Sequence, residues 1–347
     1  MTQPLSGQVA LVAGATRGAG RGIALELAAA GATVWCTGRS TRGAGATPGR
    51  PETIEETAEL IEAGGGKAVA VRVDHTAPAE VEALAARVKA EAGRLDILVN
   101  DIWGGDDLVA WGRRFWEMDL AEMPTLVERA VFSHVITARH LAPMMVEAGR
   151  GLIVEVTDGE HAGYRGQLLY DLVKASVIRL AYARAWDLAT TGVTALAITP
   201  GFLRSEAMLE RFGVTEANWR DGAKTNPDFA FSETPRFVGR AVAALAADPQ
   251  VRARSGLSLS AAELAREYGF TDLDDRQPDF WRDVDASLEP ALASDDPLPP
   301  HARHMASARY LQIHATPALA AQAHALADRL GYKNLPAGLR PYLGPGT

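Results

Sequence analysis

The chain has 347 residues, 47% of them hydrophobic, which is enough for a large core in one α/β domain or two smaller ones. It carries 35 Lys and Arg against 43 Asp and Glu, a formal net charge of −8, which argues against binding to nucleic acid or anionic membranes. The single cysteine, Cys36, excludes an internal disulfide and a CxxC metal site, and its apolar surroundings predict a buried thiol. Without a signal-like start or a run of 18 apolar residues, we expect a soluble, cytoplasmic protein.

Strand-like and helix-like patterns alternate along the chain up to about residue 260. Apolar runs predict strands at residues 8–14, 32–38, 67–74, 95–100, 151–158 and 193–201. Alanine-rich amphipathic stretches predict helices at residues 20–31, 78–93 and 170–192. This alternation is typical of βαβ units, and near-continuous apolar strands indicate a sheet covered by helices on both faces. We therefore expect an α/β fold, a doubly wound parallel sheet of the Rossmann type with about seven strands.

Three long connections interrupt the alternation, at residues 39–53, 101–120 and 202–234. Connections of this length in a compact domain are usually lids or binding loops. The second holds Trp103, Trp111 and Trp116, which are candidates either to line an apolar substrate pocket or to pack the following helix.

The first predicted strand runs into the glycine-rich sequence AGATRGAGRG, directly before a predicted helix. Glycines at this place permit a tight turn and a close approach of the backbone to a pyrophosphate, and the helix N-terminus offers free N–H groups to an anion. A strand-to-helix turn in the first βα unit therefore predicts dinucleotide binding. The candidate contacts are Gly14, Thr16, Arg17, Gly18, Ala19 and Gly20.

The residues after the second strand indicate which dinucleotide is preferred. NAD-binding proteins place an acid there to accept hydrogen bonds from the ribose, whereas this chain has CTGRS, with Arg39 and no acid. Arg17 lies in the glycine loop, and two guanidinium groups would suit a 2′-phosphate. We therefore expect NADP(H), with NAD(H) as the less favoured alternative. The other interpretation is that the two arginines are solvated surface charges without a role in binding.

Tyr170 and Lys174 stand four residues apart in a predicted helix, so that their side chains leave the same face. A nearby ammonium group would favour the phenolate and bring proton transfer by the tyrosine closer to neutral pH. The pair could equally be two neighbours on one helix face. Thr157 closes the strand before this helix, at the carboxyl edge of the sheet where α/β proteins bind their ligands.

Taken together, residues 7–260 resemble the short-chain dehydrogenase/reductase family. The family's TGxxxGxG loop appears as AGATRGAG, with Ala13 in place of threonine, and its YxxxK motif is intact. Its serine, thirteen residues before the tyrosine, appears as Thr157. The stretch SAAELAREYGFTDLDDRQPDF is similar to the tail of one subgroup of the family.

The resemblance extends to the coenzyme contacts. The family's acidic adenine contact appears as Asp74, its NNAG as NDIW, which keeps Asn100, and its PGxxxT as PGFLRS, with Ser205 in place of threonine. The coenzyme-binding residues that the resemblance implies beyond the glycine loop and Arg39 are Asp74, His75, Asn100, Tyr170, Lys174, Pro200, Gly201, Leu203 and Ser205.

The activity implied by the resemblance is reversible hydride transfer between NADP(H) and a carbonyl or alcohol carbon of a small molecule. The catalytic residues would be Thr157, Tyr170 and Lys174: Thr157 orients the substrate oxygen, Tyr170 exchanges the proton, and Lys174 lowers the pKa of Tyr170 and binds the nicotinamide ribose. Leu203 and Ser205 would lie near the nicotinamide carboxamide. Family members are usually dimers or tetramers, so the resemblance implies a homo-oligomer.

The sequence also departs from the family pattern. The family's further catalytic asparagine has no counterpart in LVERAVFSHVITARHLAPMM, where Ser133 or His134 is a candidate to hold the relay water. This loss and the altered motifs leave open an NADP(H)-binding sensor or regulatory protein with little turnover. His161 and Tyr164 are candidate substrate contacts, and the acidic and histidine residues there lack the spacing of a zinc motif, so no metal is expected.

The predicted domain organisation follows from these motifs. We expect residues 1–270 to form the dinucleotide-binding and catalytic domain. Residues 271–347, which include the Pro-rich ASDDPLPPH and the Gly/Pro-rich end LPAGLRPYLGPGT, are expected to form a C-terminal extension that is not an independent catalytic domain.

Overall fold

The computed structural model describes residues 3–43, 49–111, 113–159, 165–284 and 286. Its centre is one sheet in which all neighbouring strands are parallel, in the order β3-β2-β1-β4-β5-β6-β7. The strands are β1 (Val9–Ala13), β2 (Thr33–Gly38), β3 (Lys67–Arg72), β4 (Ile97–Asn100), β5 (Gly151–Val156), β6 (Val193–Thr199) and β7 (Ser258–Ser260). The predicted doubly wound sheet with seven strands is thus confirmed.

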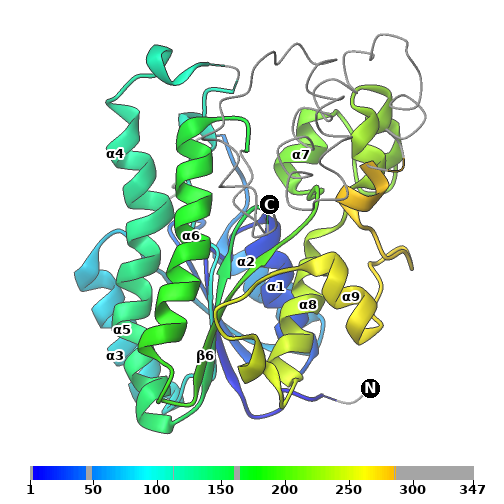
Figure 1. Ribbon diagram of the computed structural model, residues 1–347. Coiled ribbons are helices and arrows are strands. Elements are labelled where there is room, and N and C mark those ends of the chain that lie inside the picture. The colour runs from blue at the N-terminus through cyan, green and yellow to red at the C-terminus, as the bar shows by residue number, and fades with distance from the viewer. Residues whose placement is uncertain (1–2, 44–48, 112, 160–164, 285, 287–347) are drawn as a thin grey trace, which may run out of the picture.

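Helices cover both faces of this sheet (Figure 1). On one face lie α1 (Gly18–Ala29), α2 (Ile54–Ala63), α8 (Pro235–Ala247) and α9 (Ala261–Tyr268). On the other lie α3 (Pro78–Ala92), α5 (Ser133–Ala148) and α6 (Leu168–Asp187), with α4 (Glu122–Val127) joined to α5 by a π-helical turn at Glu128–Phe132. Strand β1 shows why the strand sequences are apolar throughout, because Ala10 and Val12 enter one core layer whereas Leu11 enters the other.

Helices α1 and α8 pack closely because glycine lies on both sides of their contact. A Cβ atom on Gly22 would come within 2.0 Å of the Pro235 carbonyl oxygen, and one on Gly239 within 2.5 Å of the Gly22 carbonyl oxygen. Both distances are far shorter than van der Waals contact, so any larger residue would push the helices apart. This packing fixes α1, whose N-terminus faces the carboxyl edge of the sheet.

The long connections contain short elements that the sequence patterns did not predict. Helix α2 follows the first of them, and α7 (Glu206–Arg211) lies in the third, on the same side of Figure 1 as the ends of β1 and β6. Cys36 is buried in β2 as predicted, and this burial raises the pKa of its thiol to about 12.

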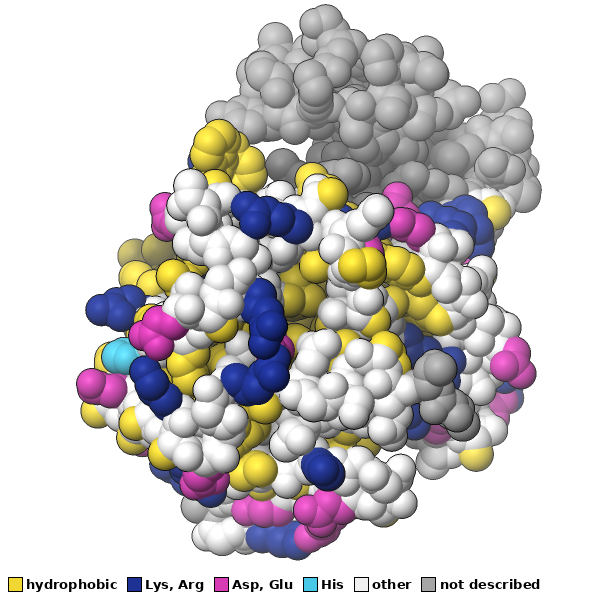
Figure 2. Space-filling model, turned by 90° about the horizontal axis from the view of Figure 1, so that it is seen from below, with side chains coloured by type: hydrophobic (Ala, Val, Ile, Leu, Met, Phe, Trp, Pro, Cys, Tyr) yellow, Lys and Arg dark blue, Asp and Glu magenta, His cyan; other side chains and the backbone are white. Residues whose placement is uncertain are grey.

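Residues 271–284 pack against the rest of the fold. Asp272 is buried and accepts hydrogen bonds from the backbone and the hydroxyl of Thr234, and Val284 is fully buried. The division at residues 270 and 271 remains a prediction. In the part of the chain that the structure describes, no helix has the length and apolar character needed to cross a membrane. Figure 2 views the edge of the sheet opposite to α7, where basic, acidic and hydrophobic side chains are interspersed.

Candidate active site

The carboxyl ends of the central strands bring the predicted motifs to one edge of the sheet. The strand register aligns Ala13 of β1 with Asn100 of β4, and Asn100 with Glu155 of β5. The residues that follow these strands therefore leave the sheet at the same edge. The glycine loop, residues 101–103 and residues 157–158 leave the sheet side by side, as expected for a ligand site of an α/β protein.

The glycine loop has the backbone geometry that a pyrophosphate site needs. Gly14 has a φ of 96°, in the left-handed region, and a Cβ atom there would lie 2.2 Å from the Asp101 carbonyl oxygen. Helix α1 begins at Gly18, and no side chain of its N-cap residue, Arg17, caps it. The N–H groups of its first turn are therefore available to an anion from elsewhere in the fold.

Two carboxylates occupy this helix N-terminus. The Gly18 N–H donates a 2.8 Å hydrogen bond to Oε2 of Glu206, from the start of α7, and the Gly20 N–H donates to the carboxylate of Asp101. Desolvation raises the pKa of Asp101 to about 7, although the charge of Lys174 opposes it. Because these carboxylate oxygens lie where helix N–H groups bind anions, they stand in for phosphate oxygens, and the loop fits a dinucleotide.

The arginines predicted to bind a 2′-phosphate lie near acids. Nη1 of Arg17 is 3.9 Å from the carboxylate of Glu52, and Nη1 of Arg39 is 3.9 Å from Asp74. Although burial opposes it, hydrogen bonds from Thr76 and the charge of Arg39 lower the pKa of Asp74. Both separations are at the long end of the range for ion pairs.

His75 has a different place from the one expected of a coenzyme contact. Its ring is buried, with one nitrogen 2.8 Å from the hydroxyl of Thr37 and the other 2.8 Å from that of Thr137. Burial lowers its pKa to about 3, so the ring is neutral and bridges β2 and α5 inside the core. A coenzyme contact by this residue would have to involve its backbone.

Asn100 belongs to a buried polar network that the sequence analysis did not identify. Its Nδ2 donates to Glu155 at 2.7 Å, and Glu155 also contacts Arg184 and, at 2.6 Å, the ring of His134. Although burial opposes it, the charge of Arg184 and these hydrogen bonds lower the pKa of Glu155. The second ring nitrogen of His134 lies 2.9 Å from the carbonyl oxygen of Ile102, so the network fixes the segment that leads to Trp103.

Helix α6 presents Tyr170 and Lys174 at this edge. The buried side chain of Gln167 caps the helix by accepting a 2.7 Å hydrogen bond from the Tyr170 N–H. The phenol packs against two rings, with centroid distances of 5.5 Å to Trp103 and 5.1 Å to Trp111. Trp111 and Trp116 are both exposed, and Trp116 packs against Phe115. The second connection thus places two of its three tryptophans at the phenol.

The electrostatics of the pair differ from the sequence expectation. The Tyr170 hydroxyl donates a 2.7 Å hydrogen bond to Oδ2 of Asp158, and desolvation and this carboxylate raise the pKa of Tyr170 well above its usual value. The ammonium of Lys174 lies 4.5 Å from the ring centroid of Trp103 and 5.7 Å from that of Tyr170. Desolvation lowers the pKa of Lys174, although Asp158 and Asp101 oppose the shift.

Thr157 is buried beside α6, and its hydroxyl donates a 2.9 Å hydrogen bond to the backbone carbonyl of Lys174. To orient a substrate oxygen, the hydroxyl would have to leave this acceptor. The hydroxyl of Ser133 donates to the Arg129 carbonyl at 2.6 Å. His161 and Tyr164, the other candidates of this region, lie outside the described residues.

Glu233 binds the segment that follows β6 through its side chain and its backbone. Oε2 of Glu233 accepts a 2.9 Å hydrogen bond from the Gly201 N–H, and its backbone pairs with Leu203. Pro200 is tied to the end of β6, because its carbonyl accepts a hydrogen bond from the Thr199 hydroxyl. Ser205 caps α7 by accepting a hydrogen bond from the Met208 N–H. The PGxxxT-like segment therefore has a fixed backbone next to the glycine loop.

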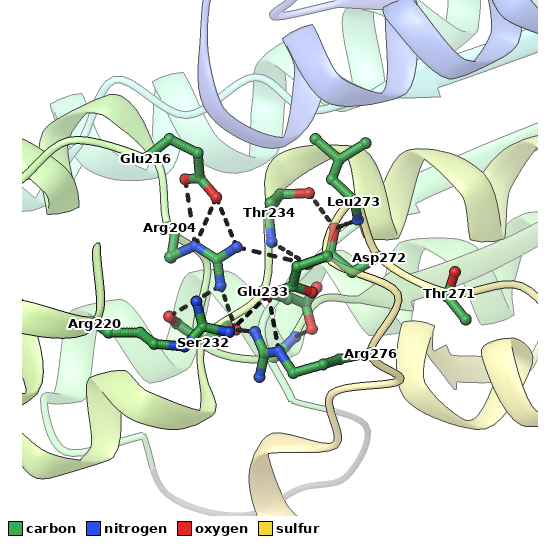
Figure 3. Close-up of polar contacts among 12 residues, drawn as sticks. Arg204, Glu216, Arg220, Ser232, Glu233, Thr234, Thr271, Asp272, Leu273 and Arg276 are labelled. Atoms are coloured by element: carbon green, nitrogen blue, oxygen red, sulfur yellow. Dashed lines mark hydrogen bonds and ion pairs between the residues drawn. The ribbon is translucent and has the colours of Figure 1, made fainter. Parts of the chain in front are cut away.

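A buried cluster around Arg204 anchors the third connection (Figure 3). The guanidinium of Arg204 is buried, stacks 4.0 Å from the ring centroid of Trp219 and donates to the Ser232 carbonyl at 2.7 Å. It also pairs with Glu216 at 2.7 Å and lies 3.9 Å from Asp272. Figure 3 shows these groups converging from the third connection and from the segment around Asp272.

Comparison with known proteins places the chain in a family. The short chain dehydrogenase family model matches residues 8–213. Dehydrogenase/reductase SDR family member 1 of Mus musculus is 36% identical over 281 residues, which cover 80% of this chain and 86% of that protein.

Solved structures give the same result. A hydroxysteroid dehydrogenase from Escherichia coli has a TM-score of 0.60 and 26% identity, over 74% of this chain and 96% of that one. A 7α-hydroxysteroid dehydrogenase complexed with NADH and 7-oxo glycochenodeoxycholic acid has a TM-score of 0.60 and 26% identity, over 75% and 94%. The chain is therefore a member of the short-chain dehydrogenase/reductase family, an oxidoreductase family, and resembles the subgroup of SDR family member 1.

Proposed function

We propose that the protein transfers a hydride between NADP(H) and a carbonyl or alcohol carbon of a small molecule, with Tyr170 as the proton donor and acceptor. The observation that carries the proposal is the place of Tyr170 and Lys174, one helical turn apart on α6, at the sheet edge that also holds the glycine loop. When bound, the coenzyme supplies the hydride.

The chain's own residues would hold the substrate and move the proton. The raised pKa of Tyr170 keeps its hydroxyl protonated, so the hydroxyl can donate a proton to a carbonyl oxygen. The ammonium of Lys174 is partly desolvated beside the phenol ring, where it can bind a ribose hydroxyl. The aromatic faces of Trp103 and Trp111 favour an apolar or ring-containing substrate.

Several finer assignments are part of the same proposal. Arg39, together with Arg17 of the glycine loop, supports NADP(H) over NAD(H), because no acid directly follows β2 and two guanidinium groups would suit a 2′-phosphate. The hydroxyl of Thr157 would turn from the Lys174 carbonyl to the substrate oxygen. We further propose a cytoplasmic homodimer or homotetramer that needs neither metal nor nucleic acid.

A second candidate function is an NADP(H)-binding sensor with little turnover. The hydroxyls of Thr157 and Tyr170 are both engaged by protein acceptors, which favours this alternative. It predicts tight binding of NADPH without oxidation by any carbonyl compound.

The test is the loss of absorbance at 340 nm with NADPH and a panel of carbonyl compounds that includes oxo-steroids. We expect turnover by the wild-type protein and a loss of at least about 100-fold in Tyr170→Phe. Undiminished activity in this variant would refute the assignment of the acid. NADPH binding without turnover on the whole panel would favour the sensor.

A further inference from the structure

The side chain that forms a hydrogen bond with the hydroxyl of Tyr170 is a carboxylate. The hydroxyl donates to Oδ2 of Asp158 at 2.7 Å, whereas the hydroxyl of the preceding residue, Thr157, is directed to the backbone carbonyl of Lys174. Asp158 is the second residue after β5, and both Asp158 and Tyr170 keep part of their surface in solvent. The carboxylate therefore lies at the phenol in a partly solvated site.

We propose that Asp158 is the proton-exchange partner of Tyr170, which holds the phenolic proton in the free protein and returns a solvent proton to the phenolate after each carbonyl reduction. The inference rests on the proposed function for its turnover step, but not for the contact itself.

During reduction, the O–H bond of Tyr170 breaks and its proton passes to the substrate oxygen, while the carbonyl carbon gains two electrons as a hydride from a reduced nicotinamide. The Asp158 carboxylate then takes up one proton from hydronium or a buffer acid and passes it to the phenolate, which restores both the phenol and the carboxylate. A carboxylic acid gives its proton to a phenolate readily, because an ordinary phenol has a pKa about six units higher. In alcohol oxidation the same transfers run in reverse.

The other charged groups around the phenol are less well placed for this exchange. Asp106 accepts a 2.6 Å hydrogen bond from the indole of Trp103, and Lys174 lies over the ring faces rather than at the hydroxyl. The charge of Asp106 adds to that of Asp158 in raising the pKa of Tyr170.

Arg165, from the segment before α6, faces the same site. Its guanidinium contacts the backbone carbonyl of Asp158 and pairs with Asp171 at 2.9 Å. Its charge lowers the pKa of Tyr170 and so opposes the carboxylates. Asp101 faces Lys174 from the end of β4 and opposes the lowering of its pKa. In the described part of the chain, Asp158 is the one of these groups whose side chain forms a hydrogen bond with the phenol.

Ser133 and His134, the two candidates to hold a relay water, already have hydrogen-bond partners within the protein. The hydroxyl of Ser133 donates to a backbone carbonyl, and both ring nitrogens of His134 lie within hydrogen-bond distance of Glu155 and Ile102. The family's further catalytic asparagine has no counterpart in this chain, and in the proposal Asp158 supplies the proton route to solvent.

The first test is an ultraviolet titration of phenolate formation, which needs neither coenzyme nor substrate. The part of the absorbance change that is lost in Tyr170→Phe belongs to Tyr170. In Asp158→Asn we expect the ionisation constant of this phenol to rise at least about tenfold. The matched control is Asp106→Asn, which removes an equal charge without removing a hydrogen bond to the phenol and should give a smaller rise. An unchanged constant in Asp158→Asn, or an equal rise in both variants, would overturn the proposal.

The second test follows turnover. Asp158→Asn should reduce carbonyls at least about tenfold more slowly than the wild type, and added formate should restore much of the rate by supplying the missing carboxyl group. Wild-type turnover in this variant, or a loss that formate leaves unchanged, would overturn the exchange role. Should Asp158→Asn fail to fold, Asp158→Ser serves in both tests. Failure of the proposed function would differ, because then the wild type itself would not oxidise NADPH.

Discussion

The backbone N–H of Gly18 donates a 2.8 Å hydrogen bond to the carboxylate of Glu206, which lies 188 residues away in the sequence. The contact joins the first turn of α1 to the start of α7. A carboxylate at this helix N-terminus takes the place of an anionic ligand, so we expect a coenzyme pyrophosphate to compete with Glu206 for the same N–H group.

We therefore predict that Glu206→Gln binds NADPH more tightly than the wild type. Removing the negative charge should increase affinity by about fivefold, since the interaction of a charge with a helix end is worth about 1 kcal/mol. NADPH fluorescence gives the dissociation constant. Glu210→Gln is the matched control, because Glu210 lies one turn further along α7 and pairs with Arg50. Unchanged or weaker binding by Glu206→Gln would show that the two anions do not compete.

The sequence was sufficient to predict the sheet and the edge at which the motifs gather, because buried parallel strands and glycine-rich turns leave local patterns. The start of α2 also has a local signal in the sequence. Thr53 accepts a hydrogen bond from the Glu56 N–H, and the sequence TIEE has the form of a capping box. This signal stands directly after a Gly- and Pro-rich stretch that is typical of a loop.

The contacts that set the chemistry of the site were harder to predict. Asp101 and Asp158 each follow a strand that ends at the ligand edge, so their positions could have been inferred, but the hydrogen bond from Tyr170 could not. Lys174 was expected to lower the pKa of Tyr170. In the free protein, desolvation and Asp158 raise this pKa, Arg165 opposes them, and all three effects depend on tertiary packing that no local spacing encodes. The contact of Glu206 depends on the path of a long connection.

We expect the choice of coenzyme to depend on Arg39. We predict that Arg39→Ala weakens NADPH binding by about tenfold or more and changes NADH binding little, because a charge-assisted hydrogen bond to the 2′-phosphate is worth about 1.5–3 kcal/mol. Calorimetric titration with both coenzymes measures the two affinities. Arg42→Ala serves as the control, since Arg42 is exposed and paired with Glu59. Equal losses for NADPH and NADH would contradict the NADP(H) preference.

Glu233 makes stability depend on pH. It is buried, its Oε1 has no hydrogen-bond partner among the described residues, and desolvation raises its pKa from 4.5 to about 8. Because the folded pKa lies above the unfolded one, its stabilising contribution is complete below pH 4.5 and is lost as the pH rises through 8.

Glu233→Gln, which cannot ionise, should therefore gain free energy of unfolding relative to the wild type as the pH rises from 4.5 to 8.5. The relative gain should be on the order of a few kcal/mol. Urea denaturation at both pH values measures it, with the exposed Glu59→Gln as the control. A stability difference that does not change with pH would be inconsistent with a protonated Glu233.

The Arg204 cluster should contribute strongly to stability. Arg204 is buried between the ring of Trp219 and the carboxylate of Asp272, and its loss would leave that buried acid without this counter-charge. We predict that Arg204→Met lowers the free energy of unfolding by about 3 kcal/mol, measured by urea denaturation. Arg220→Met is the matched control, because Arg220 stacks on the same ring at 4.5 Å but is exposed, and its loss should cost less than about 1 kcal/mol. Equal effects of the two substitutions would mean that stacking on Trp219, and not the buried charge, holds the third connection in place.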